Sequence, residues 1–450
     1  MLPTELSTPP AGVLEALSLV AGVDAALLAG FARLGPAHKD GLERLARGLA
    51  GSPLGPAVAD AVAAVRAGPP LEAHLLALAA GREALLGAAH DALLAQALAV
   101  AGYAPQPAPP ATERVAPPEA MVGLLQSARQ WLCELALGGL LQADPASVSP
   151  ILTTLERLQE SPELTRVSAL LTGLYDEWMD LLPLGTPDEA PGPRWADLWS
   201  RALLGATGVV DRPTAIPGKG RYSCFGLELR HHPHVVSAAL WGLWEPSEGP
   251  PRVARATLSG WRVPALAGAE GWHALAGAYG PLLTAIADRK SWEATASVSS
   301  SGDIRLGRGA PGPSADPLEV AAKALVAGAA LPALPGADRH PAQIAVPLLC
   351  TAKPGKDGMA LRDGVVPVRL DRLSAIQGVD AAGLAGCERW MGLLRWDRGW
   401  HITPLGGRNT SGKKPVDLGP LDAMGAEVKS TSASLSTLKQ FAGKLLRAKS

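Results

Sequence analysis

The pattern of apolar residues changes once along this chain, and that change constrains the fold more than any other feature. Residues 11–101 repeat Leu, Val and Ala at spacings of three and four, with Gly-Pro pairs between the repeats, as in consecutive amphipathic helices. From Trp195 onward the apolar residues alternate in short runs such as 222–230 and 252–263, which is typical of antiparallel strands. Helices and strands therefore come in separate groups, and the sequence predicts an α+β fold, not a doubly wound sheet.

Proline-rich stretches divide the chain into units. With 450 residues the chain is long enough for two or three domains. The linker 104–118 and the Pro/Gly/acid-rich stretch 183–194 interrupt the periodic segments. We therefore expect a helical bundle in 1–103, a second helical segment in 119–183, and a mixed antiparallel-sheet α+β domain in 195–407.

Residues 408–450 differ in kind from the rest of the chain. Their first part, 408–432, is rich in Ser, Thr, Gly and Lys and predicts a flexible basic tether. The segment 433–449 then predicts an amphipathic helix, because one face carries the candidate docking residues Leu435, Leu438, Leu445 and Leu446. A lone helix of this length is marginal in water, so it needs a surface to bury against. The α+β domain of the same chain, a partner protein and an anionic membrane all remain open as that surface.

Charge and cysteine usage exclude several classes of protein. A net charge of -1 and a pI near 6.8 give no electrostatic attraction to nucleic acid. The four cysteines lie far apart and predict free thiols in a reducing compartment. The first residues lack the pattern of a cleavable signal, and no run approaches the length of a membrane span. We expect a cytoplasmic protein that neither binds nucleic acid nor spans a membrane.

One stretch approaches a nucleotide-binding motif. Residues 407–414 match G-x-x-x-x-G-K, but Lys414 stands where a Ser or Thr hydroxyl would bind magnesium. Pro415 also prevents the helix whose N-terminus would hold a phosphate. We interpret the stretch as part of the tail.

Two clusters of titratable residues are the other candidates for chemistry. They are a Cys/His group and an acidic group: Cys224, His231, His232 and His234, and Asp176, Glu177 and Asp180. The first surrounds Pro233, which predicts an exposed turn, and it lacks the second shell that a zinc site needs. The second is typical of a solvated helix face. The sequence therefore predicts no catalytic residue, no metal and no cofactor.

The tryptophans are concentrated in the second half of the chain, with ten of the twelve between Trp195 and Trp400. Trp241 and Trp244 are three apart on one predicted strand, so their side chains point to opposite faces of the sheet. One of them can lie in a core. The other must be covered by a helix, another domain or a partner, and both are therefore candidate docking residues.

Short motifs of the second half resemble a known family. In order they are WADLW, the strand-like stretch, RHP, LLRWD and GW, at 195–199, 252–263, 339–341, 393–397 and 399–400. Together with the Ala/Leu-rich start, they are similar to uncharacterised bacterial proteins encoded beside a MoxR-type AAA+ ATPase, a von Willebrand factor A (vWA) protein and a SWIM zinc-finger protein. The likeness covers residues 1–100 and 195–405. It implies an accessory component that works with such an ATPase and a vWA partner, and it implies no catalytic residues.

Two functions remain open at this point. The first is a non-enzymatic adaptor or scaffold that mediates protein–protein interaction. The alternative is a hydrolase or transferase with an unrecognised site in 195–407, built on the histidines at 231–234 or on His340 with a carboxylate such as Asp397. A polar pocket that holds His and a carboxylate with shifted pKa values favours the enzyme, and a flat apolar patch favours the adaptor.

Overall fold

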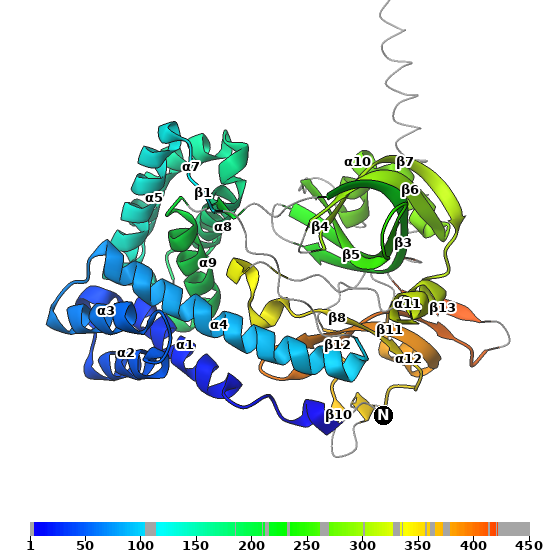
Figure 1. Cartoon of the computed structure of the whole chain (residues 1–450), viewed down its shortest axis with the longest axis horizontal. Coiled ribbons are helices and arrows are strands. Elements are labelled where there is room, and N and C mark those ends of the chain that lie inside the picture. The colour runs from blue at the N-terminus through cyan, green and yellow to red at the C-terminus, as the bar shows by residue number, and fades with distance from the viewer. Residues whose placement is uncertain are drawn as a thin grey trace, which may run out of the picture.

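The computed structural model of the chain confirms the α+β class, with helices in the N-terminal half and antiparallel sheets in the C-terminal half (Figure 1). The residues that the structure describes are 4–103, 114–184, 186–208, 210–211, 216–231, 235–261, 270–299, 302–326, 334, 336–355, 358–360, 365–371, 379–412, 415–419 and 421.

The helices of the first half share one hydrophobic core. Its members are α1 (Val13–Ala29), α2 (Pro36–Leu49), α3 (Gly55–Ala67), α4 (Glu72–Ala101), α5 (Glu119–Gly138), α7 (Leu152–Gln159), α8 (Thr165–Leu181) and α9 (Gly192–Gly205). Trp178 lies at the centre, in edge-to-face contact with Trp131 at 5.9 Å and with Trp195 at 5.6 Å between ring centroids. The helical segments on either side of the proline-rich linker therefore bury their apolar faces against each other.

This core also contains residues that the sequence assigns to the α+β domain. Trp195 and Trp199 of α9 are fully buried among the helices. The reason is that apolar residues recur along α9 at helical spacing, so the helix has one broad apolar face to bury. The observed transition from helices to strands therefore follows α9, whereas the predicted boundary lies at residue 195.

The C-terminal ends of α1 and α5 touch backbone to backbone. Gly30 and Gly139 both have positive φ angles, of 97° and 95°. A Cβ atom at Gly30 would lie 2.6 Å from the carbonyl oxygen of Gly138, and one at Gly139 would lie 2.7 Å from Ala29. Only glycine fits at these two positions, because a side chain would meet the opposing backbone.

The long helix α4 connects the helical core to the second half of the molecule. Its first half contributes Leu75 and Leu78 to the helical core, and its second half contributes Leu93 and Leu98 to a core shared with β-strands. By length and composition alone, α4 is the one helix among the described residues that is apolar enough to cross a membrane. Its buried residues pack in both protein cores, so it gives no clear membrane span.

A five-stranded antiparallel barrel follows the helices. Its strands are β3 (Ile216–His231), β4 (Val235–Pro246), β5 (Arg252–Trp261), β6 (Lys290–Val298) and β7 (Ile304–Ser314), in the order β5-β4-β3-β6-β7. A parallel bridge joins Arg255 of the outer strand β5 to Asp303, the residue directly before the other outer strand β7, and α10 (Glu270–Ala287) contacts all five strands. This order, with a helix between the third and fourth strands, is that of an OB-type barrel.

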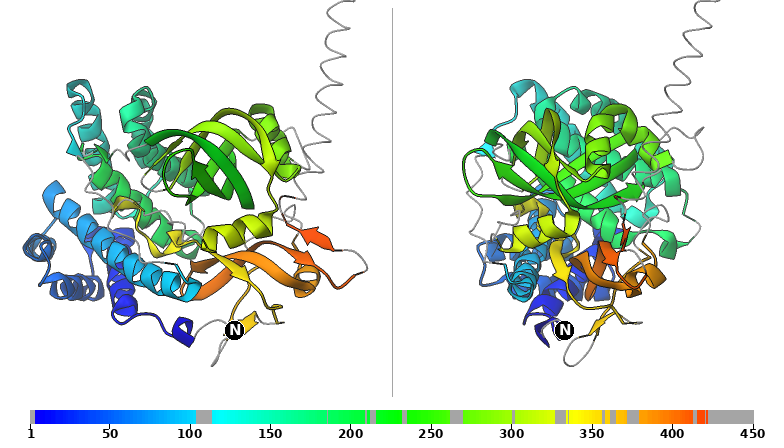
Figure 2. Two further views of the ribbon diagram at one scale, coloured as in Figure 1. Left: turned by 45° about the vertical axis from the view of Figure 1, so that its right-hand side comes forward. Right: turned by 90° about the vertical axis from the view of Figure 1, so that its right-hand side faces the viewer.

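A four-stranded sheet lies beneath the barrel. Its strands are β8 (Val346–Cys350), β11 (Cys387–Trp396), β12 (Trp400–Asn409) and β13 (Val416–Leu418), in the order β13-β12-β11-β8. The helix α11 (Pro317–Val326) contacts strands of both sheets and lies between them (Figure 2). The C-terminal half is therefore a stack in which this second sheet separates the barrel from the end of α4.

The remaining elements are short. They are α6 (Pro145–Val148), α12 (Ala381–Ala385), β1 (Arg114–Val115), β2 (Val210–Asp211), β9 (Met359–Ala360), β10 (Val365–Val366), and the 3-10 turns η1 (Thr4–Ser7), η2 (Phe31–Arg33), η3 (Leu140–Gln142), η4 (Ser149–Ile151), η5 (Pro162–Leu164), η6 (Pro187–Glu189), η7 (Gly336–Asp338) and η8 (Pro341–Gln343).

Trp241 and Trp244 occupy opposite faces of the barrel sheet, as their spacing predicts. Trp241 packs in the core between the barrel and the second sheet, and Trp244 packs inside the barrel. Each is 2% exposed. Both faces are therefore covered by the chain itself, and neither side chain is available at the surface for docking.

Candidate functional site

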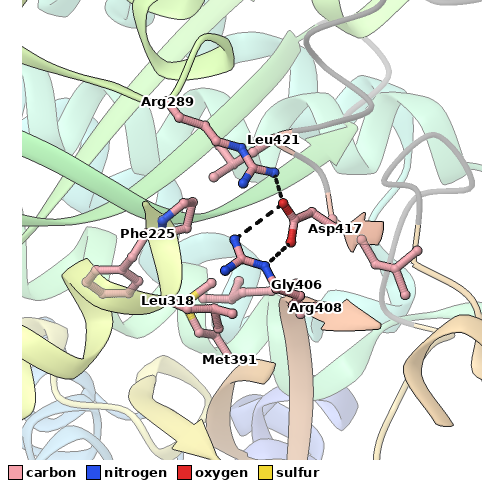
Figure 3. Close-up of a pocket in the computed structure, with 13 residues that line it drawn as sticks. Phe225, Arg289, Leu318, Met391, Gly406, Arg408, Asp417 and Leu421 are labelled. Carbon is pink, nitrogen blue, oxygen red and sulfur yellow. Dashed lines mark hydrogen bonds and ion pairs between the residues drawn. The ribbon is translucent and has the colours of Figure 1, made fainter. Parts of the chain in front are cut away.

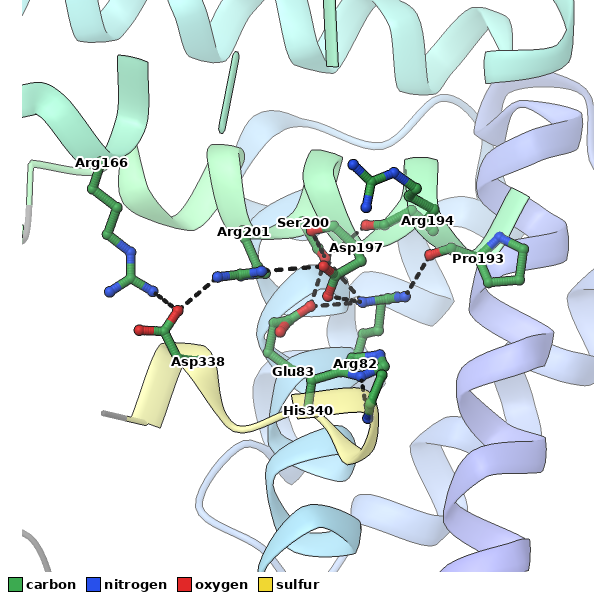
Figure 4. Close-up of polar contacts among 12 residues, drawn as sticks. Arg82, Glu83, Arg166, Pro193, Arg194, Asp197, Ser200, Arg201, Asp338 and His340 are labelled. Atoms are coloured by element: carbon green, nitrogen blue, oxygen red, sulfur yellow. Dashed lines mark hydrogen bonds and ion pairs between the residues drawn. The ribbon is translucent and has the colours of Figure 1, made fainter. Parts of the chain in front are cut away.

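A buried charge cluster lies where α4 crosses α9, and Arg82 is its centre (Figure 4). The Arg82 side chain is 1% exposed. Its Nε lies 2.7 Å from Asp24 Oδ1, and its Nη1 lies 2.7 Å from Glu83 Oε1 and 3.7 Å from Asp197 Oδ1. One guanidinium group therefore faces three carboxylates, which come from α1, α4 and α9.

Burial sets the protonation behaviour of this cluster. It raises the pKa of Asp24 and of Glu83, because the charged carboxylates lose contact with water. Burial alone would lower the pKa of Arg82, but the carboxylates around it hold that pKa above its ordinary value. Arg82 therefore stays charged, and the cluster acts as an ion-paired centre in the helical core.

The cluster extends to the segment that connects the two sheets. Asp338 of η7 accepts hydrogen bonds from Arg166 Nη2 at 2.5 Å and from Arg201 Nη2 at 2.6 Å. The next residue, Arg339, donates to Asp91 Oδ2 on α4 at 2.8 Å. These pairs fasten the connecting segment to α8, α9 and α4, so they fix the second half of the molecule to the first.

His340 is the titratable histidine of this connecting segment. Its Nδ1 accepts a hydrogen bond from the backbone N–H of Ala342 at 3.0 Å. Burial lowers the pKa of His340, and Asp197 is the main group that opposes this effect. Within the described residues, Asp197 Oδ1 and Arg201 Nε are buried and have no hydrogen-bond partner. In this part of the chain, Asp197 Oδ1 is therefore held only by its ion pair with Arg82 Nη1, and Arg201 Nε is a buried donor without an acceptor.

The sequence suggests Asp397 as the carboxylate for His340, whereas the carboxylate whose charge opposes the lowering of the His340 pKa is Asp197. Asp397 lies in the turn between β11 and β12, where its backbone N–H donates to Gly399 O at 3.0 Å. Asp197 belongs to a helix far away in sequence, so no local spacing connects it to His340. The one available signal is that Arg82 and Glu83 interrupt an otherwise apolar helical stretch.

The clusters found by sequence do not form a metal site among the residues described. Cys224 is a buried thiol whose Sγ approaches Gly226 O at 3.3 Å, and burial raises its pKa to about 12. The candidate ligands His232 and His234 lie outside the described residues. No group of three or more His, Cys, Asp and Glu side chains in the described part of the chain is placed to hold a metal ion.

The acidic group on α8 is only partly solvated. Glu177 forms an ion pair with Arg194, and its side chain is 15% exposed. Asp180 is exposed, and Asp176 is half-buried. The three carboxylates therefore differ in environment, from Glu177, which is paired with Arg194, to Asp180, which is exposed.

The glycine-rich stretch at 407–414 belongs to a second set of ion pairs. Arg408, near the end of β12, donates to Asp417 Oδ1 at 2.7 Å (Figure 3). It also donates to Asp316 Oδ2 at 2.5 Å. Arg289 approaches the same two carboxylates. The square of charges borders a cavity of about 20 Å³, which is room for about one water molecule. The ion pairs hold β13 in place, and the cavity offers no space for a nucleotide. Lys413 and Lys414 lie outside the described residues.

A third set of polar contacts joins the barrel to the second sheet. Glu228 of β3 accepts hydrogen bonds from Arg395 Nη2 at 2.6 and 2.7 Å. It also accepts one from Trp241 Nε1 at 3.2 Å. The guanidinium group of Arg255 lies over the Trp241 ring, with its central carbon 5.8 Å from the ring centroid. Trp241, a candidate docking residue, thus anchors two layers of the same chain.

A wider hollow, with polar and apolar surface in about equal measure, lies at the tip of the β11–β12 hairpin. It measures about 420 Å³, and we call it the N-terminal groove; it is lined by Leu6, Ser7, Pro9, Leu14, Val365, Val366, Trp396, Arg398, Gly399 and Trp400. Leu14 is 57% exposed and Val365 is 48% exposed, so two large apolar side chains stand open beside it. Gln96 of α4 holds its walls together, because it accepts from Trp400 Nε1 and donates to the carbonyl groups of Glu5 and Thr8.

Comparison with known proteins adds no identity to this geometry. No protein family, curated protein or solved structure was found to match the chain. The candidate docking residues Leu435, Leu438, Leu445 and Leu446 lie outside the described residues. The function has to be inferred from the arrangement of the described residues and from the sequence.

Proposed function

We propose that the protein is a cytoplasmic, non-enzymatic adaptor that joins other proteins. Its partners in this proposal are a MoxR-type AAA+ ATPase and a vWA protein, which the resemblance of its sequence motifs implies. Its docking elements are the N-terminal groove and the leucine face of the segment 433–449, which we call the leucine stripe.

The observation that carries this proposal is the separation of charge from open apolar surface. Arg82, Arg408 and Glu228, at the centres of the three polar clusters, are all paired within the chain. The open hollow of about 420 Å³ instead leaves two large apolar side chains, Leu14 and Val365, exposed beside polar surface. Exposed apolar surface rimmed by polar residues is typical of a protein-binding site.

Co-purification with the proposed partners tests the adaptor function. The full chain is co-expressed with a MoxR-type ATPase and a vWA protein, and the complex is isolated through a tag on the chain. We expect a complex that Leu14→Glu weakens, since this exposed side chain lines the groove. Leu71→Glu makes the same charge change at a 69% exposed leucine directly before α4 and should leave the complex intact.

A second pair of variants tests the leucine stripe. Leu438→Glu with Leu445→Glu places two charges on the apolar face and should weaken the complex. Thr437→Glu with Gln440→Glu adds the same charge on the opposite face of a helix and should not. Failure of the full chain to bind either gene product would refute the proposed function.

An enzyme remains the second candidate because of one observation. Burial lowers the pKa of His340 and the charge of Asp197 opposes this, while Asp197 Oδ1 has no hydrogen-bond partner within the described residues. The nearby hydroxyl of Ser200 already donates within the chain, with acceptors at Ala196 O and Glu83 Oε1. Hydrolysis or group transfer by the purified protein, lost in His340→Asn with the fold retained, would favour the enzyme over the adaptor.

A further inference from the structure

We propose that the outer face of the barrel strands β4 and β5 binds an extended, acidic segment of a partner protein. We call this surface the basic face, and its residues are Arg230, Ser237, Thr257, Ser259, Trp261 and Arg305. The inference rests on the proposed adaptor function and deepens it, because it states the chemistry of one partner.

Strand pairing brings the first row of these side chains together. Ser237 of β4 is paired with Arg230 of β3 on one side and with Ser259 of β5 on the other. The strand neighbours Val236 and Leu258 lie in the core of the barrel. Because successive residues of a strand point to opposite sides of a sheet, Ser237 and Ser259 point outward, and Arg230 points outward with them.

The bridge between the outer strands adds a second row. Arg255 of β5 is bridged in parallel to Asp303, so Thr257 and Arg305 lie side by side at the next outward position of each strand. Ile304 lies in the core of the barrel, which turns Arg305 outward. The second row therefore continues the same face.

The basic face is open, and small side chains form its middle. Thr257 and Ser259 are exposed, and Ser237 is half-buried. These hydroxyl residues separate Arg230 on β3 from Arg305 on β7, which lie three strand spacings apart, or about 14 Å along the sheet. A chain that lies along β4 and β5 would therefore have a guanidinium group on either side.

The basic face carries more positive than negative charge. Glu228 beside it is already held by an arginine of β11 at 2.6 Å, and Asp303 is held by Arg255 at 2.7 Å. Arg230 lies 3.6 Å from the same Glu228, and its side chain is 57% exposed. With the exposed Arg305, four arginines stand against two carboxylates. A surplus of positive charge on an open surface is complementary to an anionic partner.

The aromatic residues of the barrel favour a peptide over a single-stranded nucleic acid. Trp261, paired with Val235 at the end of the face, is 78% exposed. It is the one exposed aromatic side chain on the described parts of β3 to β7. Sites for single-stranded nucleic acid stack successive bases on aromatic side chains. A single ring instead suits one apolar residue, and the side chains of an extended acidic segment alternate toward the two arginine flanks.

Fluorescence anisotropy with a labelled peptide tests this inference on the purified full chain. The probe is a run of glutamates followed by one phenylalanine, and a run of lysines followed by one phenylalanine is the charge control. Thr257→Glu places a carboxylate in the middle of the basic face. Thr284→Glu makes the same change at an exposed threonine of α10 and serves as the matched control.

A second pair of variants repeats the comparison in case Thr257→Glu does not fold, which the urea midpoint shows. Arg305→Glu reverses one charge of the basic face. Arg157→Glu reverses the charge of an exposed arginine on α7, in the helical half of the molecule.

We expect saturable binding of the glutamate peptide and none of the lysine peptide. Thr257→Glu and Arg305→Glu should each weaken this binding about tenfold or more, because like charges then face each other in the complex, and the two controls should leave it unchanged. High salt should also weaken it, since the charges are screened.

Three results would overturn the inference. They are absence of glutamate-peptide binding by the parent chain, equal effects of a variant and its control, and tighter binding of a labelled oligothymidylate than of the glutamate peptide. Because neither the ATPase nor the vWA protein is present, failure here is distinguishable from failure of the co-purification that tests the adaptor function.

Discussion

Replacing Arg82 with methionine should destabilise the protein more than any surface change. Methionine keeps an apolar stem of similar length but removes the charge that faces Asp24, Glu83 and Asp197. Removing one partner of a buried ion pair costs about 3–5 kcal/mol, because the remaining charge is left uncompensated. With three carboxylates around one guanidinium, we expect a value in this range for Arg82→Met. The loss is measured as the shift in urea midpoint followed by circular dichroism at the helical band.

The pH dependence of this loss has a definite sign. Burial already raises the pKa of Asp24 and Glu83, so the folded chain binds protons that the unfolded chain has released. Their contribution to stability is therefore present at low pH and is lost as the pH rises above about 4, the unfolded value. Without Arg82 the pKa values rise further. The difference between Arg82→Met and the parent should thus be smaller at about pH 5 than at about pH 7.

A double-mutant cycle can refute this reasoning. In the parent, Asp24→Asn weakens the pairing with Arg82 and should destabilise. In the Arg82→Met background, the same change removes an uncompensated carboxylate and should stabilise. If Asp24→Asn costs the same free energy in both backgrounds, the two side chains are not coupled and the cluster does not act as an ion-paired centre.

Three further outcomes follow from the segment that connects the two sheets and from the barrel. Burial lowers the pKa of His340, so stability is lost as the pH falls through about 6.5, the unfolded value. His340→Asn keeps an acceptor for the turn and should reduce this loss, as measured by urea titrations at several pH values. Asp338→Ala removes the shared acceptor of Arg166 and Arg201 and should cost about 1 kcal/mol, since all three groups are partly exposed; faster proteolysis of the segment that connects the sheets would show it. Glu228→Gln should cost about 3 kcal/mol, because its arginine partner stays buried, and an unchanged urea midpoint would contradict this.

Local patterns predicted the fold class and the orientation of particular side chains. The change from helical to alternating spacing placed helices before strands, and the spacing of Trp241 and Trp244 placed them on opposite faces. Such inferences hold because the period of a helix or strand determines which side chains share a face. From its sequence, the segment 381–391 is also expected to be a helix, but the observed helix α12 ends at Ala385 and Cys387 begins β11. Pairing with β8 and β12 makes this segment a strand, and the local spacing of its residues gives no information on that pairing.

Long-range contacts explain what the sequence did not predict. α9 follows a proline-rich stretch that resembles a domain boundary, yet the contact of Trp195 with Trp178 places it in the helical core. The carboxylates around Arg82 come from three helices, and only the tertiary fold brings them together. The residues that line the N-terminal groove are also far apart in sequence, because they come from 6–14 and from 365–400. Single-sequence periodicity contains no information on such pairs.

The adaptor function is tested most directly by the affinity of the intact chain for its proposed partners. Isothermal titration of the purified ATPase, and separately of the vWA protein, into the full chain gives that affinity. We predict saturable binding to at least one of them, weakened about tenfold or more by Leu438→Glu with Leu445→Glu and unchanged by Thr437→Glu with Gln440→Glu; a tenfold loss is about 1.4 kcal/mol. Absence of binding by both proteins, or equal effects of the two double variants, would contradict the account.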